Sequence, residues 1–398
     1  MVGFRHISSS KTSRMIGLFS STPLNHKRWS PIYPSPIRIL NPHPRWYSTT
    51  KTANKFLYQI AASFVAKDYP YDPSHHVYHF NPNHRQIEPP LCFDQTLRVE
   101  SGQDAFFVSC TKTPGAVAFG VADGVGGWVD SGVDPADFSH GLCGYMARAA
   151  RVTQTENTQH RLTARQLMQK GYDGICHDGR VRAGGSTACV AIAEPDGTLD
   201  VANLGDSGFL QLRLNAVHAH SEPQTHAFNT PFQLSLVPPS LAARMATYGG
   251  TQLSDLPRDA DVTQHDLRNG DVLLFATDGV FDNLFHQEIL RIASQVMLST
   301  GAWVGSDEGG VRVADGFETF TEPTADRAGN PVTLQSMLAT QIVGAAKKAS
   351  VNTRVDGPFA KEVQKYFPHE NWRGGKVDDI CVVVAVVCEG QAVPKSKL

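Results

Sequence analysis

The sequence predicts an α+β protein, and two observations support this fold class. Apolar runs of strand length and helix-like segments occur in blocks, without the regular strand–helix alternation of a parallel sheet. The composition, with 41% hydrophobic and 19% charged residues among 398, is that of a globular protein that can bury a large core. No run approaches the roughly 18 apolar residues that span a bilayer, so we expect no transmembrane segment.

The N-terminal region differs in composition from the rest of the chain. Residues 1–67 contain ten Lys or Arg and no Asp or Glu, which is typical of a mitochondrial transit peptide, here predicted over residues 1–47 with the mature chain beginning near Ser48. A disordered basic tail that binds nucleic acid or lipid is the alternative. Subtracting the ten charges from the net charge of −2 leaves −12 for residues 68–398, and an acidic folded part argues against a nucleic-acid-binding surface.

The remaining elements can be placed along the chain in order. Residues 48–89 are expected to form an irregular lead segment before a domain over residues 90–389. Asp134-Pro135 predicts the start of a helix that runs to about residue 152, because Asp can cap the first turn and Pro fits the first helical position. We expect further helices at 163–176, 281–298, 333–350 and 358–366, strands at 186–194, 198–204, 208–215 and 380–388, a loop-rich region at 216–262, a loop insertion at 299–331 and a tail at 390–398.

Four aspartates lie at the ends of strand-like apolar runs. The runs before Asp123-Gly124 and Asp278-Gly279 end in an acid, whereas those that follow Asp104 and Asp378 begin with one. In an antiparallel sheet the end of one strand lies beside the start of its neighbour. The four carboxylates can therefore gather at one edge.

Such a group of carboxylates predicts a metal site. Crowded carboxylates raise one another's pKa unless a cation neutralises them, and Mg²⁺ or Mn²⁺ prefers oxygen ligands. No His or Cys belongs to these motifs, and the seven scattered cysteines form neither a disulfide framework nor a zinc pattern. The alternative is a chance set of turn acids, because Asp-Gly is first of all a turn signal.

Six motifs occur in order along the chain: Gln103-Asp104, Asp123-Gly124-Val-Gly-Gly, Gly185-Ser-Thr-Ala, Asn203-Leu-Gly-Asp206-Ser207, Thr277-Asp278-Gly279 and Asp378-Asp379. Together they resemble the motifs of a known family, the metal-dependent (PPM, type 2C) serine/threonine protein phosphatases. The similarity covers roughly residues 90–389 and is strongest to the mitochondrial branch of fungi and animals, which shares segments such as 228–235 and 264–271. It implies two packed antiparallel β-sheets flanked by helices.

The resemblance also implies roles for the candidate residues. Asp123 would bridge two Mg²⁺ or Mn²⁺ ions, the Gly124 carbonyl would bind one, and Asp278 and Asp378 would complete the shell of the other. Asp104 would orient a water at the ions, so that all four aspartates are candidate catalytic and metal-site residues. The water would then attack phosphoserine or phosphothreonine, and no protein nucleophile would be needed.

Three neighbouring acids leave alternatives to these assignments. Asp206 is interpreted as a turn residue that bonds its own backbone. Asp282 and Asp379 stand close enough to Asp278 and Asp378 to replace either in its role.

The chain departs from the usual family pattern at three positions. Gln103 stands where an acid is common, which would weaken the second metal site. Val125 replaces a histidine that could protonate the leaving oxygen. Arg98 is one residue away from the spacing of the usual phosphate-binding arginine, so we do not assign it that role.

The predicted function is therefore hydrolysis of phosphoserine and phosphothreonine on mitochondrial proteins, with coenzyme Q biosynthesis as the setting that the branch resemblance implies. The alternative is a phosphatase-fold scaffold that binds partner proteins without turnover. The expected location is the mitochondrial matrix. The C-terminal Ser396-Lys397-Leu398 is a peroxisomal signal, and it predicts a minor peroxisomal pool.

Overall fold

The computed structural model describes residues 56–81, 98–153, 161–247 and 254–390. The predicted transit peptide, the mature start near Ser48 and the C-terminal Ser-Lys-Leu lie outside these segments. None of the helices in the described segments is both long enough and apolar enough to cross a membrane.

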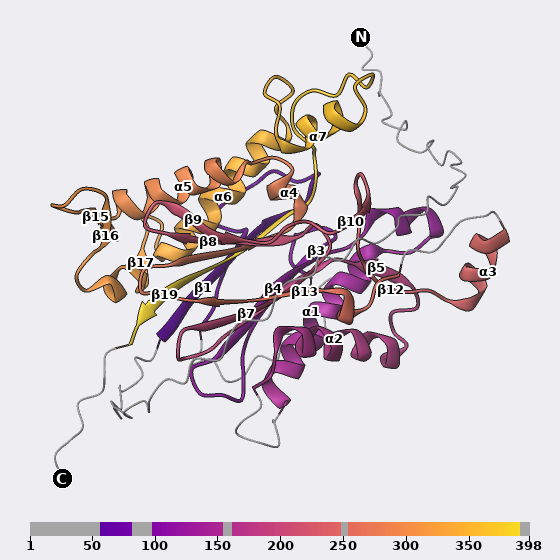
Figure 1. Ribbon diagram of the computed structural model, residues 1–398, viewed down its shortest axis with the longest axis horizontal. Helices are drawn as coiled ribbons and strands as arrows, with labels where there is room; N and C mark the ends of the chain where they lie inside the picture. Colours follow the sequence, from indigo (N-terminus) through magenta and orange to yellow (C-terminus); the bar gives the residue numbers. More distant parts are fainter. Residues whose placement is uncertain (1–55, 82–97, 154–160, 248–253, 391–398) are drawn as a thin grey trace, which may run out of the picture. The chain divides into compact units, whose positions relative to one another are not determined.

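Two antiparallel sheets form the centre of the molecule (Figure 1), which confirms the predicted α+β architecture. The six-stranded sheet has the order β2-β1-β19-β14-β8-β9, and the five-stranded sheet has the order β13-β7-β6-β4-β3. The strands of the first are β1 (Phe56–Val65), β2 (Val77–His79), β8 (Gly208–Arg213), β9 (Ala216–His220), β14 (Val272–Ala276) and β19 (Ile380–Glu389). Those of the second are β3 (Asp104–Cys110), β4 (Val117–Asp123), β6 (Ala188–Ala193), β7 (Thr198–Leu204) and β13 (Asp261–Asp266).

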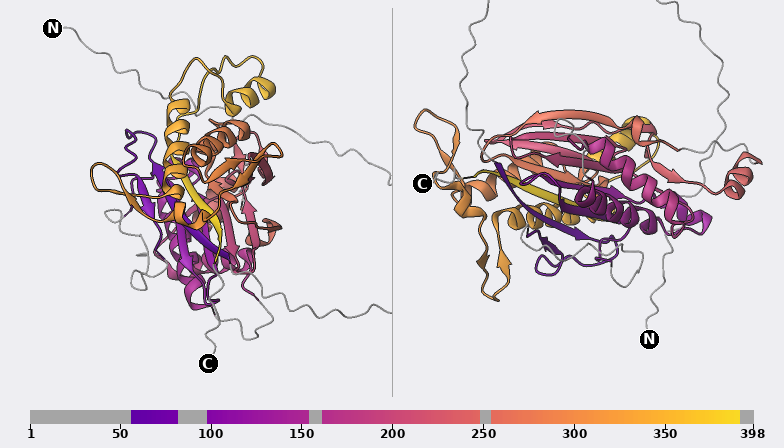
Figure 2. Two further views of the ribbon diagram at one scale, coloured as in Figure 1. Left: turned by 90° about the vertical axis from the view of Figure 1, so that its left-hand side faces the viewer. Right: turned by 90° about the horizontal axis from the view of Figure 1, so that it is seen from below.

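Helices cover the outer face of each sheet, so that the molecule has four layers (Figure 2). Helices α1 (Pro135–Val152) and α2 (Ala164–Asp178) pack on the five-stranded sheet, and α5 (His286–Ser299) and α6 (Leu334–Ser350) pack on the six-stranded sheet. Between the sheets, Phe119 of β4 meets Phe275 of β14 with ring centroids 5.1 Å apart. Strand β19 is buried on both faces, which explains its unbroken apolar sequence.

The predicted helix starts agree with the observed caps. Asp134 accepts a hydrogen bond from the Ala136 amide at 3.0 Å, and Thr163 forms a capping box with Gln166 at the start of α2. Helix α7 (Pro358–Tyr366) has the predicted bounds. The predicted helix over 281–298 is wrong at its start, because the chain forms the short α4 (Asp278–Phe281) and then turns before α5 begins at His286.

The expectation of an irregular lead over residues 48–89 is wrong for residues 56–65, whereas residues 48–55 and 82–89 lie outside the described segments. Strand β1 pairs with β19 along its whole length, from Phe56 opposite Glu389 to Val65 opposite Ile380. Most of its side chains are buried because the strand lies inside the six-stranded sheet. The domain therefore begins well before residue 90.

The region over residues 299–331, expected to be a loop insertion, is more ordered than a loop. This region contains the hairpin of β15 (Trp303–Gly305) and β16 (Val311–Val313), the 3-10 helix η4 (Phe317–Thr321), and the short strands β17 (Thr324–Ala325) and β18 (Pro331–Val332). Trp303 is fully buried, and its indole N–H donates to the Gly270 carbonyl at 3.1 Å. A buried aromatic side chain anchors this segment to the core.

The region over 216–262 is built from short elements, as expected for a loop-rich segment. After β9 it contains β10 (Thr225–Ala227), β11 (Thr230–Pro231), β12 (Leu234–Leu236) and α3 (Pro239–Thr247). Strand β12 pairs with β5 (Gly184–Ser186), and β10 and β11 form a hairpin.

Candidate metal centre

The predicted acids meet at one end of the sandwich, between the two sheets. Asp104 and Asp123 are partners in the register of β3 and β4. Asp278 follows β14 and Asp378 precedes β19, and these two strands are neighbours in the other sheet. Each sheet therefore supplies one pair of strand ends, whereas the sequence argument placed all four on the edge of a single sheet.

The glycines after Asp123 and Asp278 are required by close backbone contacts. A Cβ atom on Gly279 would lie 1.9 Å from the Asp379 carbonyl oxygen, and one on Gly124 would lie 2.8 Å from the Pro135 carbonyl oxygen. No side chain fits at these distances. The two Asp-Gly pairs therefore hold neighbouring segments together and are not simple surface turns.

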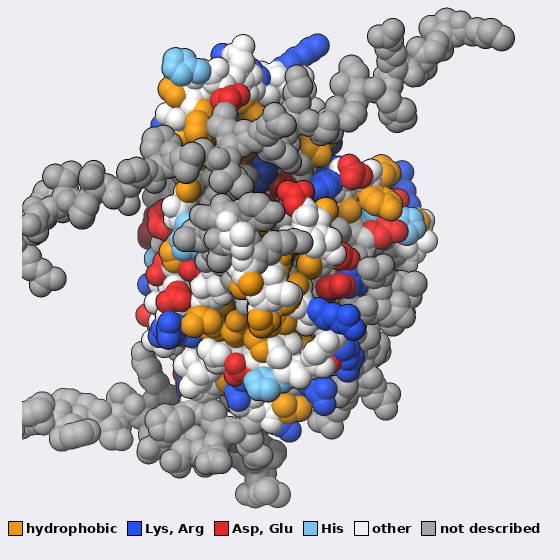
Figure 3. Space-filling model, turned by 90° about the vertical axis from the view of Figure 1, so that its right-hand side faces the viewer, with side chains coloured by type: hydrophobic (Ala, Val, Ile, Leu, Met, Phe, Trp, Pro, Cys, Tyr) orange, Lys and Arg blue, Asp and Glu red, His pale blue; other side chains and the backbone are white. Residues whose placement is uncertain are grey.

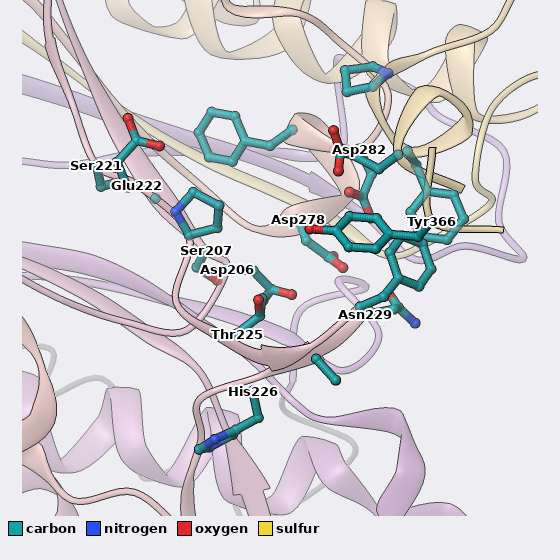
Figure 4. Close-up of a pocket in the computed structure, with 18 of the residues that line it drawn as sticks. Asp206, Ser207, Ser221, Glu222, Thr225, His226, Asn229, Asp278, Asp282 and Tyr366 are labelled. Atoms are coloured by element: carbon teal, nitrogen blue, oxygen red, sulfur yellow. The ribbon is translucent and has the colours of Figure 1, made fainter. Parts of the chain in front are cut away.

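The carboxylates form two overlapping groups. Oxygens of Asp123, Asp206 and Asp278 all lie within 4.8 Å of one another, and so do those of Asp278, Asp282 and Asp378. Asp278 belongs to both groups. Figure 4 shows Asp206, Asp278 and Asp282 close together at the centre of a pocket.

Asp206 behaves as a member of this site and not as a turn residue alone. Its Oδ1 atom is buried and has no hydrogen-bond partner among the described residues. An unpartnered buried acceptor is costly unless a ligand satisfies it. The arrangement therefore favours a bound cation beside Asp206.

Lys376 supplies positive charge to the second group. Its Nζ atom lies 2.6 Å from Asp278 Oδ2, 2.6 Å from Asp282 Oδ2 and 2.9 Å from Asp378 Oδ2. Burial alone would lower the pKa of Lys376, but the three carboxylates raise it well above its usual value. One ammonium group thus occupies the centre of three acids.

Other acids of the site have raised pKa values, including two that Lys376 contacts. Burial, and then the charge of Asp278, raises the pKa of Asp123 well above its usual value. The pKa of Asp104 is also raised well above its usual value, first by burial and then by the charge of Asp379. Burial also raises the pKa of Asp282 to about 7 and that of Asp378 to about 6, although Lys376 opposes both shifts. The pKa values show that these acids are crowded and short of positive charge.

Asp278 differs from its neighbours. Burial acts to raise its pKa, but the contact with Lys376 outweighs burial and lowers the pKa below its usual value. It therefore stays ionised most readily in the cluster.

Asp104 and Asp379 have partners of their own. The Thr277 hydroxyl donates to Asp104 Oδ2 at 2.6 Å. Asp379 accepts from the backbone amides of Lys67 at 2.7 Å and Gln103 at 2.8 Å. Asp379 therefore holds backbone segments together, and Asp378 is the one of the pair that joins the carboxylate group.

Two of the residues that depart from the family pattern, Gln103 and Arg98, have structural roles. The Gln103 carbonyl accepts from the Gly124 amide at 3.0 Å. The largely buried Arg98 side chain lies 3.1 Å from Asp134 and also pairs with Asp137 at the start of α1. Arg98 thus stabilises the start of α1.

Among these site residues, sequence reasoning missed Lys376 and placed Asp282 only as an alternative to Asp278. Asp282 follows Asp278 by four residues, which is one helical turn. Lys376 stands two residues before Asp378, and a lysine so close to an acid motif was a signal that could have been used. Asp206 was noted, but only as a turn residue.

The donor set fits a hard divalent cation. Among the described residues, both groups that could hold a metal consist of aspartates alone. Carboxylate oxygens are the ligands that Mg²⁺ and Mn²⁺ prefer, whereas zinc sites usually include His or Cys. Which oxygens bind, and whether the Gly124 carbonyl is among them, stays a prediction.

The comparisons with known proteins agree with this geometry. The family described as Protein phosphatase 2C matches residues 98–308. The chain is 38% identical to Protein phosphatase PTC7 homolog fig of Drosophila yakuba, over 72% of this chain and 76% of that one. It is 29% identical to Protein phosphatase 2C homolog 7, mitochondrial, of Saccharomyces cerevisiae, over 87% of each.

A solved structure supports the same assignment. The X-ray structure of the photosystem II phosphatase PBCP is 26% identical, with a TM-score of 0.51 over 73% of this chain and 93% of that one. The resemblance found in the sequence motifs is thereby confirmed. This chain belongs to the protein phosphatase 2C family of serine/threonine phosphatases.

Proposed function

We propose that this phosphatase hydrolyses phosphoserine and phosphothreonine on mitochondrial proteins, with Mg²⁺ or Mn²⁺ held by the aspartates between the two sheets. The observation that carries the proposal is the group of Asp123, Asp206 and Asp278, whose oxygens lie within 4.8 Å of one another. The buried and unpartnered Oδ1 atom of Asp206 supports a cation at this place.

We propose two ions. Asp123, Asp206 and Asp278 would hold the first, and Asp278, Asp282 and Asp378 would contribute to the second, where Lys376 now lies. By the family resemblance, Asp123 would contact both ions, and the Gly124 carbonyl would bind one of the two.

When bound, the ions would lower the pKa of a water toward neutrality and neutralise the phosphoryl oxygens. The chain's own contribution is to fix the carboxylates. Asp104 is held by the Thr277 hydroxyl at 2.6 Å beside its strand partner Asp123, where it can accept a hydrogen bond from a water. Val125 has no titratable group, so the proton for the leaving oxygen must come from elsewhere.

Assays on the full-length protein can distinguish an active phosphatase from a scaffold without turnover. Hydrolysis of a phosphothreonine peptide should require added Mn²⁺ or Mg²⁺ and should be lost in Asp123→Asn and in Asp278→Asn. Metal binding by the same variants, measured by calorimetry, gives a readout that does not depend on turnover. Absence of hydrolysis over a wide range of metal concentrations would favour the scaffold.

The proposed location is the mitochondrion. The composition of residues 1–67 supports it, and the yeast relative is named mitochondrial. We place the mature chain in the matrix, with a minor peroxisomal pool directed by Ser396-Lys397-Leu398. Fluorescent fusions to each terminus separately test both signals, and an unchanged distribution when the C-terminus is masked would show that the tripeptide is silent.

The proposed substrates are phosphoproteins and not nucleic acids. Residues 68–398 carry a net charge of −12. On the face shown in Figure 3, the Lys and Arg side chains of the described residues are interspersed with Asp and Glu and form no continuous basic surface. Enzymes of coenzyme Q biosynthesis are one proposed group of substrates, which phosphopeptide mass spectrometry of cells lacking this chain would test.

A further inference from the structure

A cleft with a volume of about 680 Å³ opens beside the acid cluster. Residues of the β10–β11 hairpin and of α7 line it, together with Asp206, Asp278 and Asp282 (Figure 4). A phosphoryl group at the metal centre would therefore have this cleft directly next to it.

One wall of the cleft is aromatic. Phe228, directly after β10, has its ring centroid 5.5 Å from that of Phe359 and 5.6 Å from that of Tyr366 on α7. The ring centroid of Phe367 lies 5.3 Å from that of Phe228, next to this cluster. Tyr366 is 57% exposed, so part of this apolar surface remains open to a ligand. Exposed aromatic clusters beside a polar site are typical of binding surfaces.

The charged residues of the cleft are all acidic. Besides three aspartates of the cluster, Glu222 and Glu362 line it, and no Lys or Arg does so among the described residues. Glu222 is 79% exposed and lies 3.5 Å from His220, and the half-exposed Glu362 lies 3.5 Å from Lys365. Exposed pairs of this kind are weak. Both glutamates therefore remain able to attract a cationic ligand.

We propose that this cleft binds the residues that flank the phosphorylated side chain, and that it selects segments with an aliphatic or aromatic residue and a Lys or Arg near the phosphoserine or phosphothreonine. The apolar residue would pack on Phe228 and Tyr366, and the basic residue would lie near Glu222 or Glu362. The inference rests on the proposed phosphatase activity and names the class of peptide that it acts on.

The test uses short phosphothreonine peptides that are alike except at one position. One pair carries Arg or Glu near the phosphothreonine, and a second pair carries Leu or Asn. We expect kcat/KM of the full-length, metal-loaded enzyme to be about tenfold higher for Arg than for Glu at low salt, and the ratio to shrink as salt is added. We expect a preference of about fivefold for Leu over Asn, because Leu buries apolar surface.

Variants then assign the preference to the cleft. Glu222→Lys or Glu362→Lys should bring the Arg-to-Glu ratio close to one. Glu308→Lys makes the same charge change on the β15–β16 hairpin, away from the cleft, and should leave the ratio as in the wild type. Phe228→Ala should remove the preference for Leu, whereas Phe228→Leu keeps an apolar wall and should retain it.

The possible failures are distinguishable. Equal kcat/KM for both members of each pair would overturn the cleft inference, and so would ratios for both Glu222→Lys and Glu362→Lys that equal the ratio for Glu308→Lys. Hydrolysis of p-nitrophenyl phosphate by the wild type would show in either case that the phosphatase proposal still stands. Absence of hydrolysis of this small substrate would contradict the proposed function itself.

Discussion

Replacement of Lys376 by methionine should lower the stability of the metal-free protein and should change that of the metal-loaded protein much less. The Lys376 side chain is only 15% exposed and contacts Asp278, Asp282 and Asp378 at 2.6, 2.6 and 2.9 Å. Methionine keeps much of the length and apolar stem of lysine but removes the charge. The three carboxylates then face one another without a cation.

The magnitude follows from the geometry. At an effective dielectric constant of ~20, two unit charges ~3 Å apart attract each other by roughly 5 kcal/mol. Desolvation of the buried groups offsets part of this energy, and loss of one partner from a buried ion pair costs about 3–5 kcal/mol. For a domain of this size that loss lowers Tm by roughly 5–10 °C.

The assay is thermal unfolding in EDTA and in Mg²⁺, with Lys170→Met as a matched control. Lys170 is an exposed lysine on α2, so its replacement should change stability by less than ~0.5 kcal/mol. Mg²⁺ can occupy the place of the ammonium group, and a ligand at 100 times its Kd adds about 2.7 kcal/mol of stability. Lys376→Met should therefore recover most of its loss when Mg²⁺ is added.

Two results would refute this reasoning. If Lys376→Met in EDTA unfolds at the wild-type temperature, the lysine does not stabilise the acid cluster. If the loss is the same in EDTA and in Mg²⁺, the lysine stabilises the fold for another reason, and divalent ions do not use its position.

Three further predictions concern residues around the site. Asp206→Asn should weaken Mn²⁺ binding by at least about tenfold in calorimetry, because it removes a charge from the cluster. Unchanged Mn²⁺ affinity would show that Asp206 acts only as a turn residue. Gly279→Ala should lower the free energy of unfolding by more than ~3 kcal/mol, since its Cβ would lie 1.9 Å from the Asp379 carbonyl oxygen, and chemical denaturation would measure this loss. Burial, and then the charge of Arg98, lowers the pKa of His140 to about 4. As the pH falls from about 6.5 to about 4, the unfolded chain binds a proton that the folded chain does not, so stability falls by about 3 kcal/mol. His140→Gln should flatten that part of the pH–stability curve, and an unchanged slope would contradict the low pKa of His140.

Local signals in the sequence predicted the local structure well. The Asp134-Pro135 pair marked the start of α1, and the apolar run at the end of the domain marked β19 as a central strand. The first signal depends only on adjacent residues. The second depends on complete burial, which an unbroken apolar run indicates. The four aspartates at strand ends could be grouped for the same reason, because each lies where an apolar run begins or ends.

The features that the sequence did not reveal depend on long-range pairing. Strand β1 is recognisable mainly through its partner β19, which lies more than three hundred residues away in the chain. Trp303 lies in a Gly-rich region, and only its burial against Gly270 shows that the region is folded. Asp206 follows β7 in one sheet and Lys376 lies before β19 in the other, so their closeness to the same carboxylates depends on how the two sheets pack.

The most direct test of the account is anomalous X-ray diffraction from crystals of the Mn²⁺-loaded protein. We expect an anomalous peak between the two sheets, within coordination distance of carboxylate oxygens of Asp123, Asp206 and Asp278. A catalytically active crystal form with no peak at this position, or with Mn²⁺ bound only elsewhere, would contradict the claim that these aspartates hold the ions of the phosphatase.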